Sequence, residues 1–204
     1  MYKTITIVVL MMLLFGVASL ADTLTLTGTS GEVFNGEAVG PYGVTVNGTL
    51  QQMVCDDLYI QIGLGYSWDA TRLGWENLTE QERRDLYGPA YWLTTSVLTD
   101  TGLHADEQWA LWHLFSPQSE LPGDSAASLT WALGQYAANP DYAGYASLLV
   151  YRPNPRTSSQ EFLATQESFA DTVTDTPESG TLLLVLLGSG TIWMGRRRVA
   201  PIQS

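Results

Sequence analysis

Polar and apolar residues alternate with a period of two in the first part of the chain. Residues 22–27 alternate strictly, and the stretches 44–46 and 49–55 lie on either side of Asn47-Gly48. Because Asn-Gly accepts the positive φ values of a type I′ turn, these two stretches are predicted to pair as a hairpin. Cys55 would then lie near the end of the second strand.

The spacing of apolar residues becomes helical from residue 79. Thr79 and Glu82 have the form of a capping box, with a hydroxyl at the helix cap and a carboxylate three residues later. Pro89 suits the first turn of the helix that follows. Two further helices are predicted, over residues 106–115 and 124–138.

The overall pattern predicts an α+β fold. An antiparallel β-rich half is expected to pack on a helical segment at 79–138, and short strands are expected at 147–151 and 161–164. The expected domain spans residues 22–164, a size that suits a single hydrophobic core. Residues 165–176 are polar and acidic, so they are expected to form a tether.

The N-terminus has the pattern of a secretory signal peptide. Lys3 precedes an apolar run at 5–17, and Ser19 and Ala21 place small residues at the two positions that a signal peptidase reads. We therefore expect residues 1–21 to be removed during export.

A second hydrophobic stretch lies near the C-terminus. Residues 181–195 are almost entirely apolar and are followed by Arg196, Arg197 and Arg198. Because a charge at the centre of a bilayer costs about 2.5–3.5 kcal/mol on insertion scales, the arginines are expected to stay in the cytoplasm. The stretch is predicted to be a short transmembrane helix. A buried core helix is the alternative, but three arginines rarely follow one at the end of a chain.

This end of the chain resembles the PEP-CTERM sorting signal of Gram-negative bacteria. The resemblance covers residues 177–198 and rests on Pro177 and Glu178, on the apolar span and on the arginines, and it departs from the family at Ser179, where a second proline is expected. The resemblance implies export, recognition by an exosortase-type membrane enzyme, cleavage near the tripeptide, and delivery to the cell surface or extracellular matrix. The inner membrane would hold the chain as an intermediate.

The charge and the cysteine count exclude several classes of partner. Four of the nine basic residues lie in the two ends, which leaves five arginines against 21 acidic residues. Nucleic acid requires a basic surface, so nucleic-acid binding is not expected. Cys55, His104 and His113 fall short of the four ligands of a structural zinc, and a single cysteine forms no disulfide within the chain. No metal or cofactor is expected.

The motifs of common hydrolases and phosphate-binding loops are missing from the sequence. Asp56 and Asp57 are adjacent, so on a strand they would point to opposite faces and could not form a close carboxylate pair. A solvated turn is expected there, and calcium binding together with Asp69 is the alternative. His104 and His113 are expected to be packed or exposed rather than to shuttle protons.

One remaining pattern combines Val54-Cys55 on a strand with Gln108-Trp109-Ala110-Leu111-Trp112 at the start of a helix. This pattern resembles the thioester domains of bacterial surface proteins, in which a strand cysteine is followed by a Gln-x-Ala-aliphatic-Trp helix. The resemblance implies a bond between the Cys55 thiol and the Gln108 carbonyl carbon, formed with loss of ammonia and open to attack by amines. The alternative is a small buried thiol and a glutamine that only decorates a helix.

The function expected from these observations is non-catalytic. We expect an exported, surface-sorted structural or adhesion protein, with an extracellular polysaccharide matrix as a candidate partner. A covalent adhesin that uses Cys55 and Gln108, and a secreted enzyme, are the alternatives. The processing partners expected are a signal peptidase and the exosortase-type enzyme.

Overall fold

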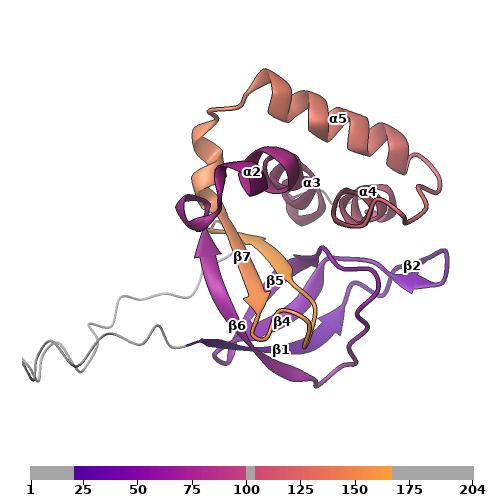
Figure 1. Cartoon of the computed structure of the whole chain (residues 1–204). Helices are drawn as coiled ribbons and strands as arrows, with labels where there is room; N and C mark the ends of the chain where they lie inside the picture. Colours follow the sequence, from indigo (N-terminus) through magenta and orange to yellow (C-terminus); the bar gives the residue numbers. More distant parts are fainter. Residues whose placement is uncertain (1–20, 100–103, 167–204) are drawn as a thin grey trace, which may run out of the picture. The chain divides into compact units, whose positions relative to one another are not determined.

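The computed structural model describes residues 21–99 and 104–166 (Figure 1). The predicted sorting signal at 177–198 lies outside these residues, as do all of the predicted signal peptide except Ala21 and most of the predicted tether. Within the described residues, no helix is both long enough and apolar enough to cross a membrane.

A closed antiparallel barrel forms the β-rich half of the described chain, in the strand order β1-β4-β5-β8-β7-β6. The strands are β1 (Asp22–Thr29), β4 (Tyr42–Val46), β5 (Thr49–Cys55), β6 (Ser67–Gly74), β7 (Leu148–Pro153) and β8 (Phe162–Thr165). Strand β6 closes the barrel because it pairs with β1 on one side and with β7 on the other. Closure leaves these strands without an open edge.

The predicted hairpin is strands β4 and β5. Asn47 and Gly48 form its turn with φ values of 50° and 87°, as the Asn-Gly dipeptide predicted. The register pairs Val46 with Thr49 and Tyr42 with Met53. Alternation then carries every second side chain into the barrel, so Cys55 ends β5 pointing inward.

Four helices lie together on one side of the barrel (Figure 1). They are α2 (Glu80–Glu82), α3 (Gly88–Thr99), α4 (Ala105–Phe115) and α5 (Ser125–Ala138), with a π-helical turn at Arg83–Tyr87 and 3-10 turns at Trp75–Asn77 and Ala143–Ser147. The predicted capping box is present: the Thr79 hydroxyl accepts from the Glu82 N–H at 3.1 Å, and the Thr79 N–H donates to the Glu82 carboxylate at 2.9 Å. This cap fixes where the helical half begins.

The end of β5 separates two apolar cores. Cys55 packs inside the barrel among residues such as Leu24, Trp68 and Phe162. Val54, one residue earlier, faces outward and packs under the helices with Leu111. Each fully buried large side chain contributes about 1.5–3 kcal/mol, so strand β5 is held from both faces.

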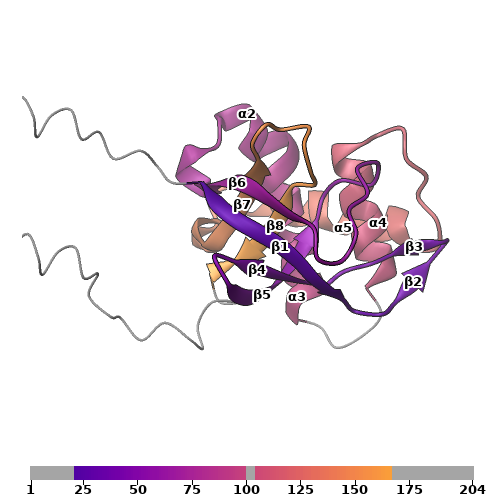
Figure 2. The same cartoon turned by 90° about the horizontal axis from the view of Figure 1, so that it is seen from below.

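A third, smaller core joins the first loops of the chain to α4. The hairpin of β2 (Val33–Phe34) and β3 (Glu37–Ala38) lies beside α4 (Figure 2). Phe34 and Val39 pack there against Trp109 and Trp112. This contact brings residues 39 and 40 to the face of α4 that also meets β5.

The mixed helix-and-strand class with an antiparallel sheet is confirmed. The strands expected at 147–151 and 161–164 are observed one or two residues away, as β7 and β8. The closure of the sheet into a barrel was not predicted. Strand β6 points only Trp68 and Ala70 inward, so it gives a weak alternating signal, and its pairing with β1 is distant in sequence.

Candidate functional site

Cys55 is the last residue of β5 and is 1 % exposed. The chain turns tightly around its sulfur: the Asp57 N–H donates to Sγ at 3.3 Å, and the thiol donates to the Asp57 carbonyl at 3.1 Å. The Asp57 carboxylate stabilises the same turn, because it accepts from the N–H groups of Tyr59 and Ile60. The thiol is therefore fixed at the end of a strand.

Gln108 approaches Cys55 from α4. Its side chain is fully buried, and its Nε2 donates to the main-chain carbonyl of Cys55 at 2.6 Å. Its Oε1 accepts from the Gly40 N–H at 3.2 Å. Both hydrogen bonds orient the amide, with nitrogen toward Cys55 and oxygen toward Gly40. The structure thus brings together the two residues that the sequence singled out.

Gly40 is part of this site, although the sequence analysis did not identify it. A Cβ atom at this position would lie 2.8 Å from Gln108 Oε1 and 3.3 Å from the Tyr42 ring. Any side chain there would therefore push the Gln108 amide out of place. The glycine before β4 could not be linked to the site from the sequence, because its neighbour Gln108 on α4 is distant along the chain.

Aromatic rings exclude water from the Cys55 thiol. Tyr42 and Trp112 are both buried and lie close to it. Burial raises the pKa of Cys55 well above its usual range, and the Asp56 carboxyl raises it further. The free thiol is therefore protonated at neutral pH and protected from oxidation.

Asp56 does not lie in a solvated turn, as the sequence analysis expected, because the barrel folds a second carboxyl over it. Asp56 is 3 % exposed and lies close to the Glu161 carboxyl, which is 8 % exposed. The Asp56 N–H also donates to the Glu161 carbonyl at 3.3 Å. Burial raises the pKa of Asp56 well above its usual range, and Glu161 adds to the shift. The fold therefore favours the neutral form of the Asp56 carboxyl.

The Glu161 carboxylate also belongs to a network of ion pairs and hydrogen bonds. Arg152 donates to Glu161 at 2.9 Å and to Glu82 at 3.1 Å, and it also bonds the Tyr87 hydroxyl at 2.8 Å. Tyr87 in turn donates to Glu161. Arg152 on β7 thus joins the capping box, the π-helical turn and the Glu161 carboxylate. No local pattern indicates this network, because its members lie in separate segments of the chain.

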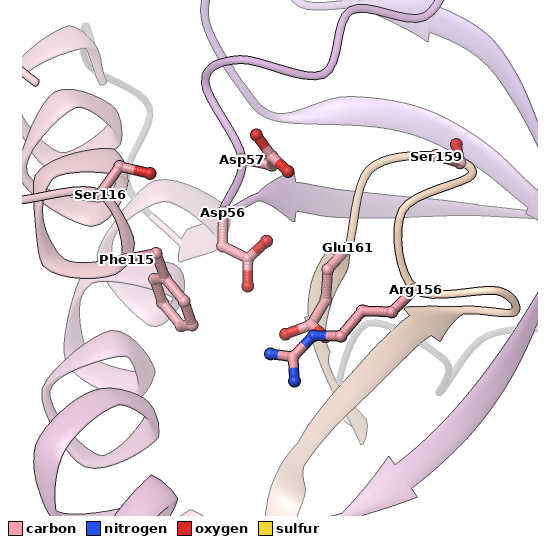
Figure 3. Close-up of a pocket in the computed structure, with 7 residues that line it drawn as sticks. All are labelled: Asp56, Asp57, Phe115, Ser116, Arg156, Ser159 and Glu161. Carbon is pink, nitrogen blue, oxygen red and sulfur yellow. The ribbon is translucent and has the colours of Figure 1, made fainter.

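A cavity of about 160 Å³ opens between the end of α4 and the carboxyl pair (Figure 3). Asp56, Asp57 and Glu161 line it together with Phe115, Ser116 and Arg156. Asp57 also lines a second cavity, of about 300 Å³, whose wall includes Tyr42 and Trp112. Asp57, whose main chain encloses the Cys55 sulfur, is therefore shared by the linings of both cavities.

The histidines and Asp69 do not join this site. His104 is the buried cap residue before α4, and His113 bonds the Ser119 carbonyl at 2.8 Å, so both have packing or capping roles. Asp69 accepts from Thr23 on the neighbouring strand. Among the described residues, no three His, Cys, Asp or Glu side chains are close enough to hold a metal ion. The alternative of a calcium site formed by Asp56, Asp57 and Asp69 is therefore not supported.

The sorting residues Pro177, Glu178, Arg196, Arg197 and Arg198 lie outside the described residues. Comparisons of the chain with protein-family models, with curated proteins and with solved structures gave no match. The assignment of a function thus rests on the site itself and on the pattern of the two chain ends.

Proposed function

We propose that this protein is exported, sorted to the cell surface, and able to form covalent bonds there through an internal thioester between Cys55 and Gln108. The observation that carries the thioester is the buried Gln108 amide, held between the Cys55 carbonyl and the Gly40 N–H. A glutamine that only decorates a helix would be exposed, whereas Gln108 is fully buried and both of its amide atoms are hydrogen-bonded.

Thioester formation exchanges one bond for another. The Cys55 sulfur attacks the Gln108 carbonyl carbon, the carbon–nitrogen bond breaks, and the thiol proton leaves with the amide nitrogen as ammonia. Negative charge develops on Oε1 during the attack, and the Gly40 N–H is already bonded to that oxygen. Gly40 thus supplies an oxyanion donor, and the Cys55 carbonyl holds the departing NH₂ group.

The thioester would react with amines. An amine nitrogen attacks the same carbonyl carbon, the sulfur leaves as the Cys55 thiol, and an amide bond joins the partner to Gln108. Tyr42 and Trp112 keep the site dry, which protects the thioester from hydrolysis until a nucleophile arrives. The high pKa of the Cys55 thiol means that the thiolate takes up a proton as it leaves.

Export and sorting complete the proposal. Their support is the signal-peptide pattern at 1–21 and the order of Pro177-Glu178, apolar span and three arginines. The proposed processing partners are a signal peptidase and an exosortase-type enzyme in the inner membrane. The acidic domain would then reach the surface, where amines on proteins or on matrix polysaccharides are available targets.

Intact mass tests the thioester. The purified chain is expected to weigh one ammonia less than its sequence, to show no free thiol when unfolded in mild acid, and to take up methylamine. Cys55→Ala and Gln108→Ala should each abolish uptake. Gln51→Ala is the matched control, because Gln51 is a buried glutamine on the same strand as Cys55 and lies outside the site. An unmodified mass with a free thiol refutes the thioester and leaves a non-covalent surface protein.

A further inference from the structure

The proposed thioester is buried, so a nucleophile needs a route to it. Cys55 is 1 % exposed and Gln108 is 0 % exposed. Both cavities described above have Asp57 in their lining, and the main chain of Asp57 encloses the Cys55 sulfur. Either cavity could therefore lead from solvent to the reacting carbon. The cavity that does so decides which amines can react.

The larger cavity, of about 300 Å³, is lined by two further residues that border the Gln108 amide. Trp112 follows Gln108 by one turn of α4, about 6 Å along the axis, and residues four apart share a helix face. Tyr42 borders the amide from β4: a Cβ at Gly40 would lie 3.3 Å from the Tyr42 ring and 2.8 Å from Gln108 Oε1. Thus β4, α4 and the turn after β5 each place a lining residue beside the site.

The smaller cavity is further from the amide along α4. Phe115 and Ser116 line it, and they lie at the end of α4, two turns beyond Gln108 and about 10 Å along the axis. The opposite side of this cavity is formed by Glu161 and its neighbours (Figure 3). The approach to Gln108 is therefore shorter from the larger cavity.

The lining of the larger cavity extends from the surface to the interior. Thr29 and Gln61 are exposed, whereas Tyr42 and Trp112 are buried. The cavity therefore connects solvent with the aromatic residues that cover the Cys55 sulfur.

Two separate segments form the outer walls of this cavity. Glu37 belongs to the β2–β3 hairpin, and Gln61 belongs to the loop after β5. A solvent-exposed hydrogen bond joins the two walls, from Gln61 Nε2 to Glu37 Oε2 at 3.4 Å. This distance is long for an N–H···O bond, so the walls can separate there at low cost. Leu58, near the start of the same loop, packs with Trp112 in the third core and holds the loop beside the site.

We propose that the 300 Å³ cavity is the route by which a nucleophile reaches the Gln108 carbonyl carbon, and that Gln61 sets the size of the amine that can pass. The reaction at the end of this route rests on the proposed function. The route itself is a property of the fold and leads equally to the Cys55 sulfur, so it can be tested with or without a thioester.

The test compares how fast a small and a large amine label the wild-type chain. Methylamine and benzylamine are used at equal concentrations of free amine, and uptake is followed by intact mass. Gln61→Ala should increase the benzylamine rate several-fold and the methylamine rate less, because it widens the outer end of the cavity. Gln61→Trp should slow both amines several-fold, and benzylamine more. Gln61 is exposed, so both variants should keep the fold, which urea unfolding checks.

The matched control is at the rim of the smaller cavity. Arg156→Trp places an equally large ring at an exposed position there and should leave both rates unchanged. Equal rates in the wild type and in both Gln61 variants would overturn the route. Slower labelling in Arg156→Trp than in Gln61→Trp would also overturn it, because entry would then be through the smaller cavity.

Failure of the thioester has a separate readout. If the wild-type chain has lost no ammonia, the proposed function fails and Cys55 carries a free thiol. The same variants are then compared in the native state by the rate at which iodoacetamide alkylates Cys55. Faster alkylation in Gln61→Ala and slower alkylation in Gln61→Trp would support the route to the site, and equal rates would overturn it.

Discussion

The Gln108 side-chain amide donates a 2.6 Å hydrogen bond to the main-chain carbonyl of Cys55. This contact joins the helical half of the domain to the end of a barrel strand at a point where both residues are buried. The bond to Gly40 on the other side of the amide fixes its rotation. The fold therefore fixes the orientation of the Gln108 amide beside the main chain of Cys55.

Gly40→Ala is predicted to prevent thioester formation. The new Cβ would lie 2.8 Å from Gln108 Oε1, so the amide must move and lose its oxyanion donor. The fraction of chains that have lost ammonia, measured by intact mass, should fall steeply, and crowding should lower stability by about 1–3 kcal/mol. Gly28→Ala is the control, because nothing lies within 4 Å of a Cβ there. An unchanged ammonia loss in Gly40→Ala would contradict the role given to Gly40.

Asp56→Asn is predicted to stabilise the protein at neutral and alkaline pH. The fold raises the pKa of Asp56 above its unfolded value, so its neutral form is favoured and the stability linked to it is lost as pH rises through the folded pKa. Asparagine is neutral at every pH, so the variant should gain about 1–3 kcal/mol near pH 8. Urea unfolding from about pH 4 to pH 8 should show the two proteins converging toward acid pH. A constant difference across this range would show that Asp56 is ionised in the fold.

Glu82 gives the free energy of unfolding the opposite dependence on pH. This contribution is the same in the wild type and in Asp56→Asn. Hydrogen bonds from Thr79 and the charge of Arg152 lower the pKa of Glu82, so its contribution is present at neutral pH and is lost as pH falls through the lowered pKa. The comparison between wild type and Asp56→Asn is therefore unaffected by it. Both curves should decline together at the acid end.

Arg152→Ala is predicted to be strongly destabilising. Glu161 and Glu82 would lose their cation, and the Glu161 side chain is only 10 % exposed. Leaving a buried charge without its partner costs about 3–5 kcal/mol. Arg72→Ala is the matched control: its side chain is 56 % exposed and lies 3.7 Å from Asp22, so the loss should stay below about 1 kcal/mol. Thermal or urea unfolding measures the stability of both variants. Equal losses of stability in Arg152→Ala and Arg72→Ala would refute the stabilising role given to the Arg152 network.

Replacing Pro177 and Glu178 by alanine is predicted to trap the protein at the inner membrane. The prediction follows from the tripartite C-terminal pattern, in which these residues precede the apolar span. Fractionation should find the wild-type chain outside the membrane when the sorting enzyme is present. Alanine at Thr174 and Asp175, just upstream, is the control. Equal release of the variant and the wild type would refute the sorting signal.

Local signals account for the parts of the fold that could be predicted. The Asn47-Gly48 turn and the Thr79–Glu82 capping box are formed by residues close in sequence, and both are observed. The closure of the barrel depends on β6 meeting β1, a pairing for which no local pattern exists. The strands with which β6 pairs are set by the twist of the whole sheet.

The candidate site likewise contains residues that the sequence could identify and residues that it could not. Cys55 and Gln108 were singled out because Val54-Cys55 and the Gln108–Trp112 pattern resemble those of thioester domains. Asp56 was placed wrongly in a solvated turn, because its burial depends on Glu161 from the last strand. Gly40 could not be identified, since its importance is the space it leaves for a side chain on α4.

The position of β8 has a mechanical consequence. This last strand of the described chain lies between β5 and β7, with Cys55 opposite Phe162 and Leu148 opposite Thr165. If a partner were bound through Gln108 while force acted on the chain after Thr165, that force would enter the barrel through β8. Two ladders of main-chain hydrogen bonds would then be loaded in shear at the same time, rather than opened one bond after another. A domain anchored through the segment after β8 would therefore have to break both ladders before that strand comes away.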